Sequence, residues 1–239
     1  MPLNEFCRTE LLVGEDGIAK LHNSKVIVFG IGGVGSFVVE ALTRAGVGNL
    51  ILVDNDTICI SNINRQIHAR QSTVGMIKVE AMKERVISIN PNCNVEAKQV
   101  FITAENISEI IPSDVDYVVD AIDTVTSKLA LAEYCYKNNI NIISSMGTGN
   151  KIDPTQFRVS DVFKTKVCPL AKVMRYELRK RGVKKLKVVY SEEMPMTPDK
   201  GRAVPSQKRQ TPGSISFVPP VAGMIIGGEV IKDLTGLNK

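Results

Sequence analysis

The chain has 239 residues, of which 44% are hydrophobic, so it can fill the core of one large α/β domain, and global disorder is excluded. Its 30 basic and 25 acidic side chains give a net charge of +5, but residues 1–150 carry 12 basic and 17 acidic side chains, whereas residues 151–239 carry 18 and 8. The basic C-terminal part predicts a polyanionic partner, with an ordinary solvated surface as the alternative.

Signals for membrane insertion, export and disulfide formation are missing. No stretch reaches the run of about 20 apolar residues that a membrane span requires, and the first residues have no basic segment followed by an apolar one. The five cysteines are odd in number and include no C-x-x-C pair, which argues against a disulfide framework and a zinc site. We therefore expect a cytoplasmic protein with reduced thiols.

Strand and helix patterns alternate through the first 150 residues. Short apolar runs predict strands at residues 25–29, 50–53, 95–101, 116–122 and 141–145, and helical spacing predicts helices at 36–45, 79–89 and 126–137. Because crossovers between parallel strands are right-handed, this alternation predicts an α/β fold with a doubly wound, Rossmann-like, mainly parallel sheet.

Further elements are expected to continue the same sheet beyond residue 150. The pattern predicts strands at residues 156–160, 187–190 and 214–218, a helix that begins at Pro169, and a final helix at 221–234. Residues 192–212 contain four prolines and few apolar anchors, which predicts a long mobile loop. We expect one domain over residues 1–239, with a nucleotide-binding half (1–150) and a basic substrate-binding half (151–239).

A glycine-rich turn follows the first predicted strand and opens a helix. Its pattern is G-x-G-G-x-G, formed by Gly30, Gly32, Gly33 and Gly35. These glycines allow the backbone to approach a phosphate, and the helix N-terminus offers free N–H groups. Asp54 ends the second strand and is placed to accept hydrogen bonds from ribose hydroxyls. Taken alone, these features fit NAD, FAD or ATP.

Cations beyond the turn favour ATP. Arg65 and Lys78 are expected at the surface of the crevice where outer phosphates would lie. Cations there stabilise the charge that develops on the α-phosphate and on departing pyrophosphate, which hydride transfer does not require. Asp123 follows the strand at 116–122 and is expected to hold Mg²⁺, with a helix N-terminal acid as the alternative.

Several spaced motifs resemble the ThiF/MoeB/HesA family of adenylating enzymes, which are related to the ubiquitin-activating enzymes. The motifs are F-C-R-T-E with Arg8, the glycine turn, L-x-D-x-D with Asp54 and Asp56, N-x-N-R-Q with Asn62 and Arg65, T-V-G-x-x-K with Lys78, and D-A-I-D with Asp123. The resemblance implies ATP and Mg²⁺ as cofactors. It implies that Asp54 binds the ribose, that Asp56 belongs to the nucleotide site, and that Arg65 and Lys78, supported by Asn62, contact the triphosphate. It also implies that Asp123 holds Mg²⁺ and that Arg8 reaches the γ-phosphate, often across the interface of a homodimer.

The later motifs are similar to one branch of this family, which dehydrates threonylcarbamoyladenosine in tRNA to a cyclic form. They are S-S-M-G-T-G-N-K at residues 144–151, P-L-A at 169–171 and G-S-I-S-F-V-P at 213–219. The resemblance implies tRNA as substrate and allows for a sulfur-transfer-type accessory protein. Two alternatives are adenylation of a sulfur-carrier protein, which the missing zinc cysteines weaken, and a non-catalytic NAD-binding regulator, which leaves Arg65, Lys78 and Asp123 unexplained.

The predicted helix after Pro169 combines an apolar stripe with a basic one. Residues 164–187 hold ten Lys or Arg side chains and a single acid, Glu177. Lys172, Arg175 and Arg179 share one face and are expected to follow a tRNA phosphate backbone, with a solvated helix face as the alternative. Cys168 directly precedes this helix. We expect its thiol to pack in the core, and the alternative is that it accepts an activated acyl group.

Overall fold

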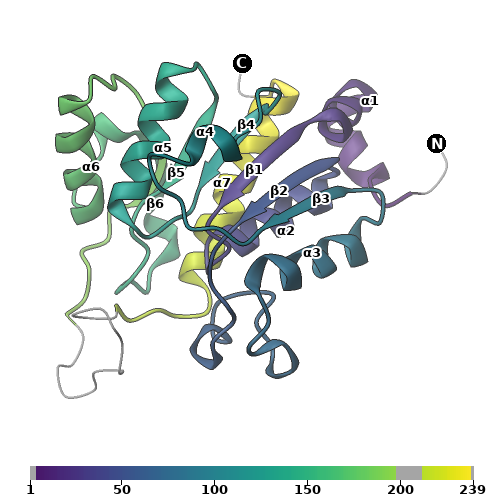
Figure 1. Ribbon diagram of the computed structural model, residues 1–239, viewed down its shortest axis with the longest axis horizontal. Helices are drawn as coiled ribbons and strands as arrows, with labels where there is room; N and C mark the ends of the chain where they lie inside the picture. The colour runs from purple at the N-terminus through teal and green to yellow at the C-terminus, as the bar shows by residue number, and fades with distance from the viewer. Residues whose placement is uncertain (1–3, 198–211, 238–239) are drawn as a thin grey trace.

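The computed structural model describes residues 4–197 and 212–237, which contain a seven-stranded sheet in the order β3-β2-β1-β4-β5-β7-β6 (Figure 1). The strands are β1 (Lys25–Phe29), β2 (Asn49–Val53), β3 (Asn94–Lys98), β4 (Tyr117–Asp120), β5 (Ile142–Ser145), β6 (Phe157–Asp161) and β7 (Lys187–Ser191). The helices are α1 (Cys7–Asn23), α2 (Gly35–Ala45), α3 (Lys78–Ile89), α4 (Ile107–Ile110), α5 (Val125–Lys137), α6 (Pro169–Lys180) and α7 (Val218–Thr235). Among the described strands, only β6 runs antiparallel to its neighbour.

The strand order confirms the predicted doubly wound α/β sheet. The chain passes outward from β1 through β2 to β3 and then returns to the other side of β1 with β4. Phe29 of β1 is therefore paired with both Val53 and Asp120. At such a switch point the loops after neighbouring strands diverge and leave a crevice at their carboxyl ends. β5, β7 and β6 extend the sheet beyond β4, as expected for the C-terminal half.

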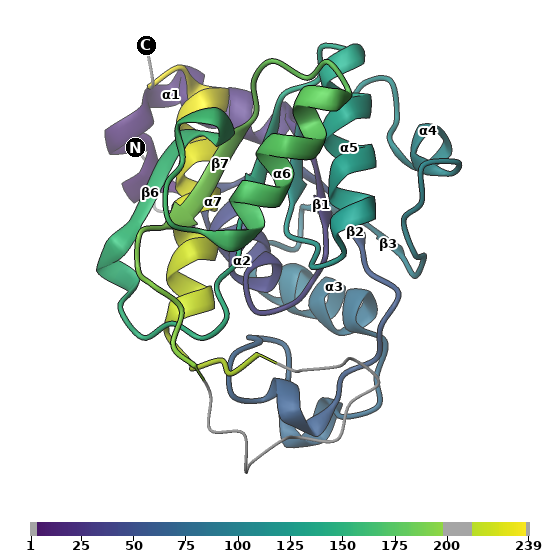
Figure 2. The same cartoon turned by 90° about the vertical axis from the view of Figure 1, so that its left-hand side faces the viewer.

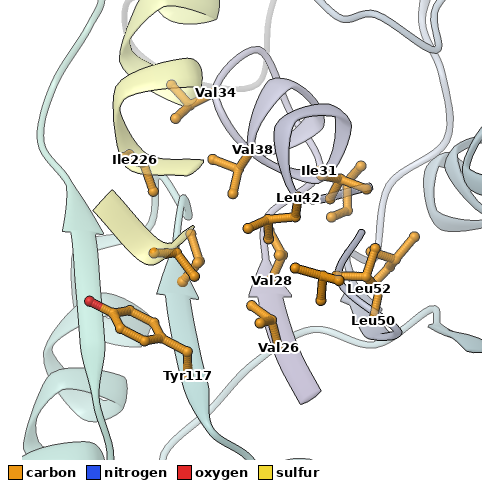
Figure 3. Close-up of a cluster of buried hydrophobic side chains, with 14 of the residues drawn as sticks. Val26, Val28, Ile31, Val34, Val38, Leu42, Leu50, Leu52, Tyr117 and Ile226 are labelled. Carbon is orange, nitrogen blue, oxygen red and sulfur yellow. The ribbon is translucent and has the colours of Figure 1, made fainter. Parts of the chain in front are cut away.

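Apolar clusters cover both faces of the sheet. On one face, β1, β2 and β4 pack against α2, α3 and α7, as the contacts around Val38, Leu52 and Ile226 illustrate (Figure 3). On the other face, α4 and α5 cover β1 and β4, and α6 packs beside α5 over β7 (Figure 2). These strands are buried on both faces, which is why their sequences read as continuous apolar runs.

α2 and α7 approach each other unusually closely. A Cβ atom at Gly223 of α7 would lie 2.4 Å from the carbonyl oxygen of Val34, and one at Gly227 would lie 2.6 Å from the Cβ atom of Ala41. Only glycine leaves room for this contact. The last described helix is therefore held directly against the helix that follows the glycine turn.

One expected element is absent from the structure, one helix was not expected, and one expected loop lies mostly outside the described residues. The strand predicted at 214–218 is wrong: residues 214–217 form neither helix nor strand, and α7 begins at Val218 because Pro219 and Pro220 fit the first turn of a helix. The helix α1 was not predicted, since Gly14, at φ +74°, interrupts its pattern. For the predicted loop at 192–212, residues 192–197 contain no helix or strand, and residues 198–211 lie outside the described part. No helix of the described residues is long and apolar enough to cross a bilayer.

Candidate active site

The glycine turn joins β1 to α2 and lies against the end of β4. Gly30 has a φ of +85°, and a Cβ atom there would lie 2.7 Å from the carbonyl oxygen of Ala121. A Cβ atom at Gly35 would lie 1.8 Å from the carbonyl oxygen of Gly30. Both positions therefore require glycine. The turn presents the N-terminus of α2, with its free N–H groups, at the carboxyl edge of the sheet.

The two middle glycines face different surroundings. A Cβ atom at Gly33 would lie 3.2 Å from Cγ of Arg65 and 3.1 Å from Cβ of Pro219, so the turn, the Arg65 loop and the start of α7 meet here. At Gly32 the nearest atom would be Nε2 of Gln66, at 3.9 Å. Gly32 thus leaves the most open approach to the backbone of the turn.

Asp54 connects the glycine turn to the loop after β2. Its Oδ2 accepts a hydrogen bond from the N–H of Ile31 at 2.7 Å, and its Oδ1 accepts one from the N–H of Asp56 at 2.8 Å. Burial raises the pKa of this carboxyl group, and the positive charge of Lys78 opposes the rise. Each carboxylate oxygen keeps a second lone pair, which can accept a ribose hydroxyl.

Lys78 is the first residue of α3 and lies between two carboxylates. Its Nζ is 2.7 Å from Oδ2 of Asp56 and 3.9 Å from Oδ1 of Asp54. The residue is only 5% exposed, so the expected position at the crevice surface is wrong for Lys78. The cause is the pair of aspartates, which together hold the ammonium group inward. An ATP phosphate would have to share this cation with Asp56.

Arg65 lies on the loop between β2 and α3. Its Nη1 donates to the carbonyl oxygen of Ser61 at 2.9 Å and to Oδ1 of Asn64 at 2.8 Å. Arg65 is half-buried, and this burial lowers the pKa of its guanidinium group, although arginine stays charged in proteins. The buried Asn62 accepts the N–H of Cys59 at 2.9 Å, so it shapes the turn that carries Arg65.

The end of β4 is fixed by a buried network that sequence reasoning missed. The Nζ of Lys128 lies 2.9 Å from Oδ2 of Asp120 and donates to the carbonyl oxygen of Ile122 at 3.2 Å. Ser144 donates to the same carboxylate at 2.5 Å, and Oδ1 of Asp120 accepts the N–H of Ile122 at 3.1 Å. In the sequence, Lys128 falls within the apolar stripe of α5. A cation at such a position indicates a buried partner, and this signal could have revealed the network.

Asp123 follows this network, three residues after the end of β4, and is exposed. Thr124 donates to its Oδ1 at 3.5 Å. Within the described residues, no three His, Cys, Asp or Glu side chains gather to hold a metal ion. The donor set fits Mg²⁺ only in the form that this ion often takes with nucleotides, with one carboxylate and the remaining ligands from phosphates and water.

Arg8 is far from this crevice in its own chain. It is exposed in the first turns of α1, two residues after Phe6. Phe6 packs on the ring of His22, with centroids 5.3 Å apart, and lies against Gly46, which ends α2. Arg8 therefore lies near the end of α2 opposite the glycine turn.

The three cations predicted to share a face of α6 have different surroundings. Lys172 and Arg179 are exposed, and the guanidinium group of Arg179 lies 5.2 Å from the centroid of the Phe163 ring. Arg175 is half-buried and donates through Nη1 to the side-chain and backbone oxygens of Thr165. Arg175 thus anchors the segment before α6, which sequence spacing did not reveal.

Two polar side chains behind the Arg65 loop are buried. Oε1 of Gln66 and both ring nitrogens of His68 have no hydrogen-bond partner among the described residues. Burial, with Lys78 and Arg85 nearby, lowers the pKa of His68 to about 4. The ring is therefore neutral at physiological pH and packs as part of the loop.

Cys168 is the residue before α6 and is 2% exposed. It packs with Met146, Ala171 and Met174 in the apolar cluster between α5 and α6. This placement favours packing, and it gives no direct approach for an acyl group from solvent.

Comparison with known proteins places these features in a family. The chain matches the ThiF family over residues 6–239. The chain belongs to the ThiF family. This membership confirms the resemblance carried by the glycine turn and by the motifs that follow it in both halves of the chain.

Two dehydratases are informative relatives of this ThiF-family chain. It is 46% identical over 241 residues to a tRNA threonylcarbamoyladenosine dehydratase of Bacillus subtilis, covering 97% of this chain and 95% of that one. Solved structures of the Escherichia coli tRNA N6-threonylcarbamoyladenosine dehydratase resemble it with TM-scores of 0.89 for the AMP complex and 0.88 for the ATP complex. Their identities are 36% and 35%, and each match covers 98% of this chain and 95% of that chain.

Proposed function

We propose that this chain is an ATP-dependent, AMP-forming tRNA threonylcarbamoyladenosine dehydratase. The observation that carries the proposal is the match to dehydratases along nearly the whole chain, including one solved with ATP. The crevice supports it, because the glycine turn, Asp54, Lys78 and Arg65 meet at the switch point between β1 and β4. A nucleotide is expected to bind at such a point.

The chemistry proceeds in two steps. The carboxylate of threonylcarbamoyladenosine attacks the α-phosphorus of ATP, and pyrophosphate leaves. A nitrogen atom of the same modified base then attacks the activated carbonyl carbon and expels AMP, which carries away the carboxylate oxygen. The net result is ring closure with loss of one water, and no cysteine is required.

Each residue of the crevice has a proposed role toward the nucleotide. The turn formed by Gly30, Gly32, Gly33 and Gly35 is proposed to bring its backbone close to the phosphates, with free N–H groups at the N-terminus of α2, and Asp54 is proposed to accept the ribose hydroxyls. Arg65 and Lys78 stabilise the charge on the phosphates; Asp56 pairs with Lys78, and Asn62 shapes the turn that carries Arg65. Asp123 would hold Mg²⁺, which neutralises the leaving pyrophosphate when bound.

The protein is proposed to act as a homodimer. Arg8 cannot serve the crevice of its own chain from the opposite end of α2, so its proposed γ-phosphate contact requires a second copy. The neighbouring side chains of Leu11 and Leu12 are 77% and 81% exposed on α1, as expected for an apolar contact surface.

The basic half is proposed to bind tRNA within a single domain of residues 1–239. Lys172 and Arg179 are accessible to phosphates, whereas Arg175 contributes chiefly by supporting α6.

The five free cysteines fit a reducing, cytoplasmic location. A sulfur-transfer-type accessory protein is a further proposed partner.

The deciding experiment measures AMP release from ATP with Mg²⁺ and one acceptor at a time. The acceptors are tRNA bearing threonylcarbamoyladenosine, unmodified tRNA and a sulfur-carrier protein. We expect AMP only with the modified tRNA, together with loss of one water from the mass of its modified nucleoside. Pyrophosphate release with the carrier alone, together with a gain in the carrier's mass equal to one bound AMP, would establish the adenylyltransferase alternative, and NAD binding without any pyrophosphate or AMP release would establish the regulator.

A further inference from the structure

We propose that Asn64 is a positioning residue for Arg65, which links the orientation of its guanidinium group to the segment before α7. This inference rests on the proposed function, in which Arg65 contacts the triphosphate. The amide group of Asn64 makes a bond on each side. Its Oδ1 accepts from Nη1 of Arg65 at 2.8 Å, and its Nδ2 donates to the carbonyl oxygen of Ser214 at 3.0 Å.

These contacts use one end of the guanidinium group completely. Nη1 carries two N–H donors; one is bound to the carbonyl oxygen of Ser61 and the other to Asn64. The donors on Nε and Nη2 lie outside both contacts, and this pair of nitrogens has the fork geometry that matches a phosphate. Asn64 therefore fixes the rotation of the group while leaving its phosphate-binding edge available.

The stem of Arg65 is held separately. A Cβ atom on Gly33 would lie 3.2 Å from the Cγ atom of Arg65 and 3.1 Å from the Cβ atom of Pro219. Packing thus sets the position of the stem between the glycine turn and α7. The amide of Asn64 adds the constraint that packing cannot supply, which is the orientation of the charged end.

The segment that accepts the Asn64 bond is itself anchored. Gly213 donates to Oδ1 of Asn150 at 2.6 Å, and the N–H of Asn150 donates back to Gly213 at 2.8 Å. Asn150 follows β5, and its carbonyl oxygen also accepts the N–H of Met196 at 2.7 Å. Hydrogen bonds, together with the peptide link between Gly213 and Ser214, therefore connect the loop after β5 with Arg65.

A double-mutant cycle tests the inference. Asn64→Ala should lower kcat by about 10-fold, the effect of losing one or two positioned hydrogen bonds, with less than about a threefold change in KM for ATP. In an Arg65→Ala background, the same substitution should lower kcat by less than about twofold, because its target is gone. Equal losses in both backgrounds would overturn the proposal, since a loop-stabilising role does not depend on Arg65.

Two further variants separate the halves of the amide. Asn64→Asp keeps the acceptor for Arg65 and loses the donor to Ser214, so its kcat should lie between those of the wild type and Asn64→Ala. Asn138→Ala is the matched control, since this exposed asparagine also donates to a backbone carbonyl, that of Tyr134 at 2.8 Å, but contacts no arginine. Its kcat should be unchanged. An Asp variant as impaired as the Ala variant would overturn the role of the Arg65 contact.

Failure of the proposed function would look different. If wild-type protein released no AMP with modified tRNA, the dehydratase assignment would fail first. The cycle would then be read from the rise in unfolding temperature that ATP produces, where Asn64→Ala should reduce the rise only when Arg65 is present. A reduction of the same size without Arg65 would overturn the positioning role on its own.

Discussion

The ammonium group of Lys128 lies 2.9 Å from the carboxylate of Asp120, and neither side chain is accessible to solvent. Through its second contact, with the carbonyl oxygen of Ile122, Lys128 also fixes the backbone just before Asp123. The buried charge pair at the carboxyl end of β4 thus fixes the backbone next to Asp123, the proposed Mg²⁺ ligand.

Replacing Lys128 should be strongly destabilising. Lys128→Met leaves the Asp120 carboxylate buried without its cation, and such a loss costs about 3–5 kcal/mol in the free energy of unfolding. Lys137→Met is the control, because Lys137 is exposed in its pair with Glu133 and should cost about 0.5 kcal/mol or less. Urea denaturation measures both. Similar losses in the two variants would contradict the importance of the buried pair.

Removing either phosphate-site cation should reduce turnover. Arg65→Ala and Lys78→Ala should each lower kcat by about 10²-fold or more, as expected when one preorganised donor is lost. Lys78→Ala should be the less stable of the two variants, because it leaves Asp54 and Asp56 without a shared cation. Arg65 is half-buried and has no ion pair among the described residues. Steady-state AMP formation and thermal unfolding check the two parts. Near-wild-type AMP formation in either variant would refute its role.

Acid should destabilise the fold through His68. The pKa of this buried imidazole is about 4 in the folded chain, against about 6.5 in an unfolded one. Between these values the unfolded chain binds a proton that the folded chain does not, so stability rises with pH across this window and is complete above it. In His68→Gln, the free energy of unfolding should change with pH by about 3 kcal/mol less across this window than in the wild type. Urea unfolding between about pH 4.5 and 7.5 measures the slopes, and equal slopes would contradict the prediction.

Mixing two inactive variants should restore activity if Arg8 acts on a second copy. In a heterodimer of Arg8→Ala and Lys78→Ala chains, one site has both intact residues and the other has neither. Random pairing of equal amounts should therefore recover about a quarter of wild-type activity. The mixture is assayed for AMP release after subunit exchange. Activity no higher than that of the separate variants, with exchange demonstrated, would contradict the shared site.

The two exposed cations of α6 should contribute to tRNA affinity, and Arg175 to stability. Lys172→Ala and Arg179→Ala should weaken tRNA binding and each reduce the slope of log affinity against log salt by about one unit. Arg175→Ala should instead lower the unfolding temperature, because it releases the Thr165 segment. Binding titrations across a salt series distinguish these effects. Unchanged slopes would mean that this face of α6 is only a solvated surface.

The strands were predictable because each buried run is short and apolar. Residues 25–29 match β1, and the other parallel strands agree in place although β3 ends earlier than predicted, at Lys98. Residues 214–218 failed because alternation of Ser, Ile and Phe resembles a strand, while the decisive signal was the proline pair that starts α7. In α1, the glycines hid a helix that tertiary packing supports.

The site was predictable where a motif fixes both residue type and position. Asp54 and the glycines lie together at the carboxyl edge of the sheet, where the motif predicts them. The burial of Lys78 was not predictable, since it depends on two aspartates whose side chains meet only in the folded chain. The roles of Lys128 and Arg175 likewise depend on partners 8 and 10 residues away in the sequence, Asp120 and Thr165, for which no simple spacing rule exists.

The close packing of α7 on α2 also orders events during synthesis. The residues that cover α2, around Gly223 and Gly227, leave the ribosome about 180 residues after it. Until they do, the helix behind the glycine turn lacks its cover over Val38, which is fully buried in the finished fold.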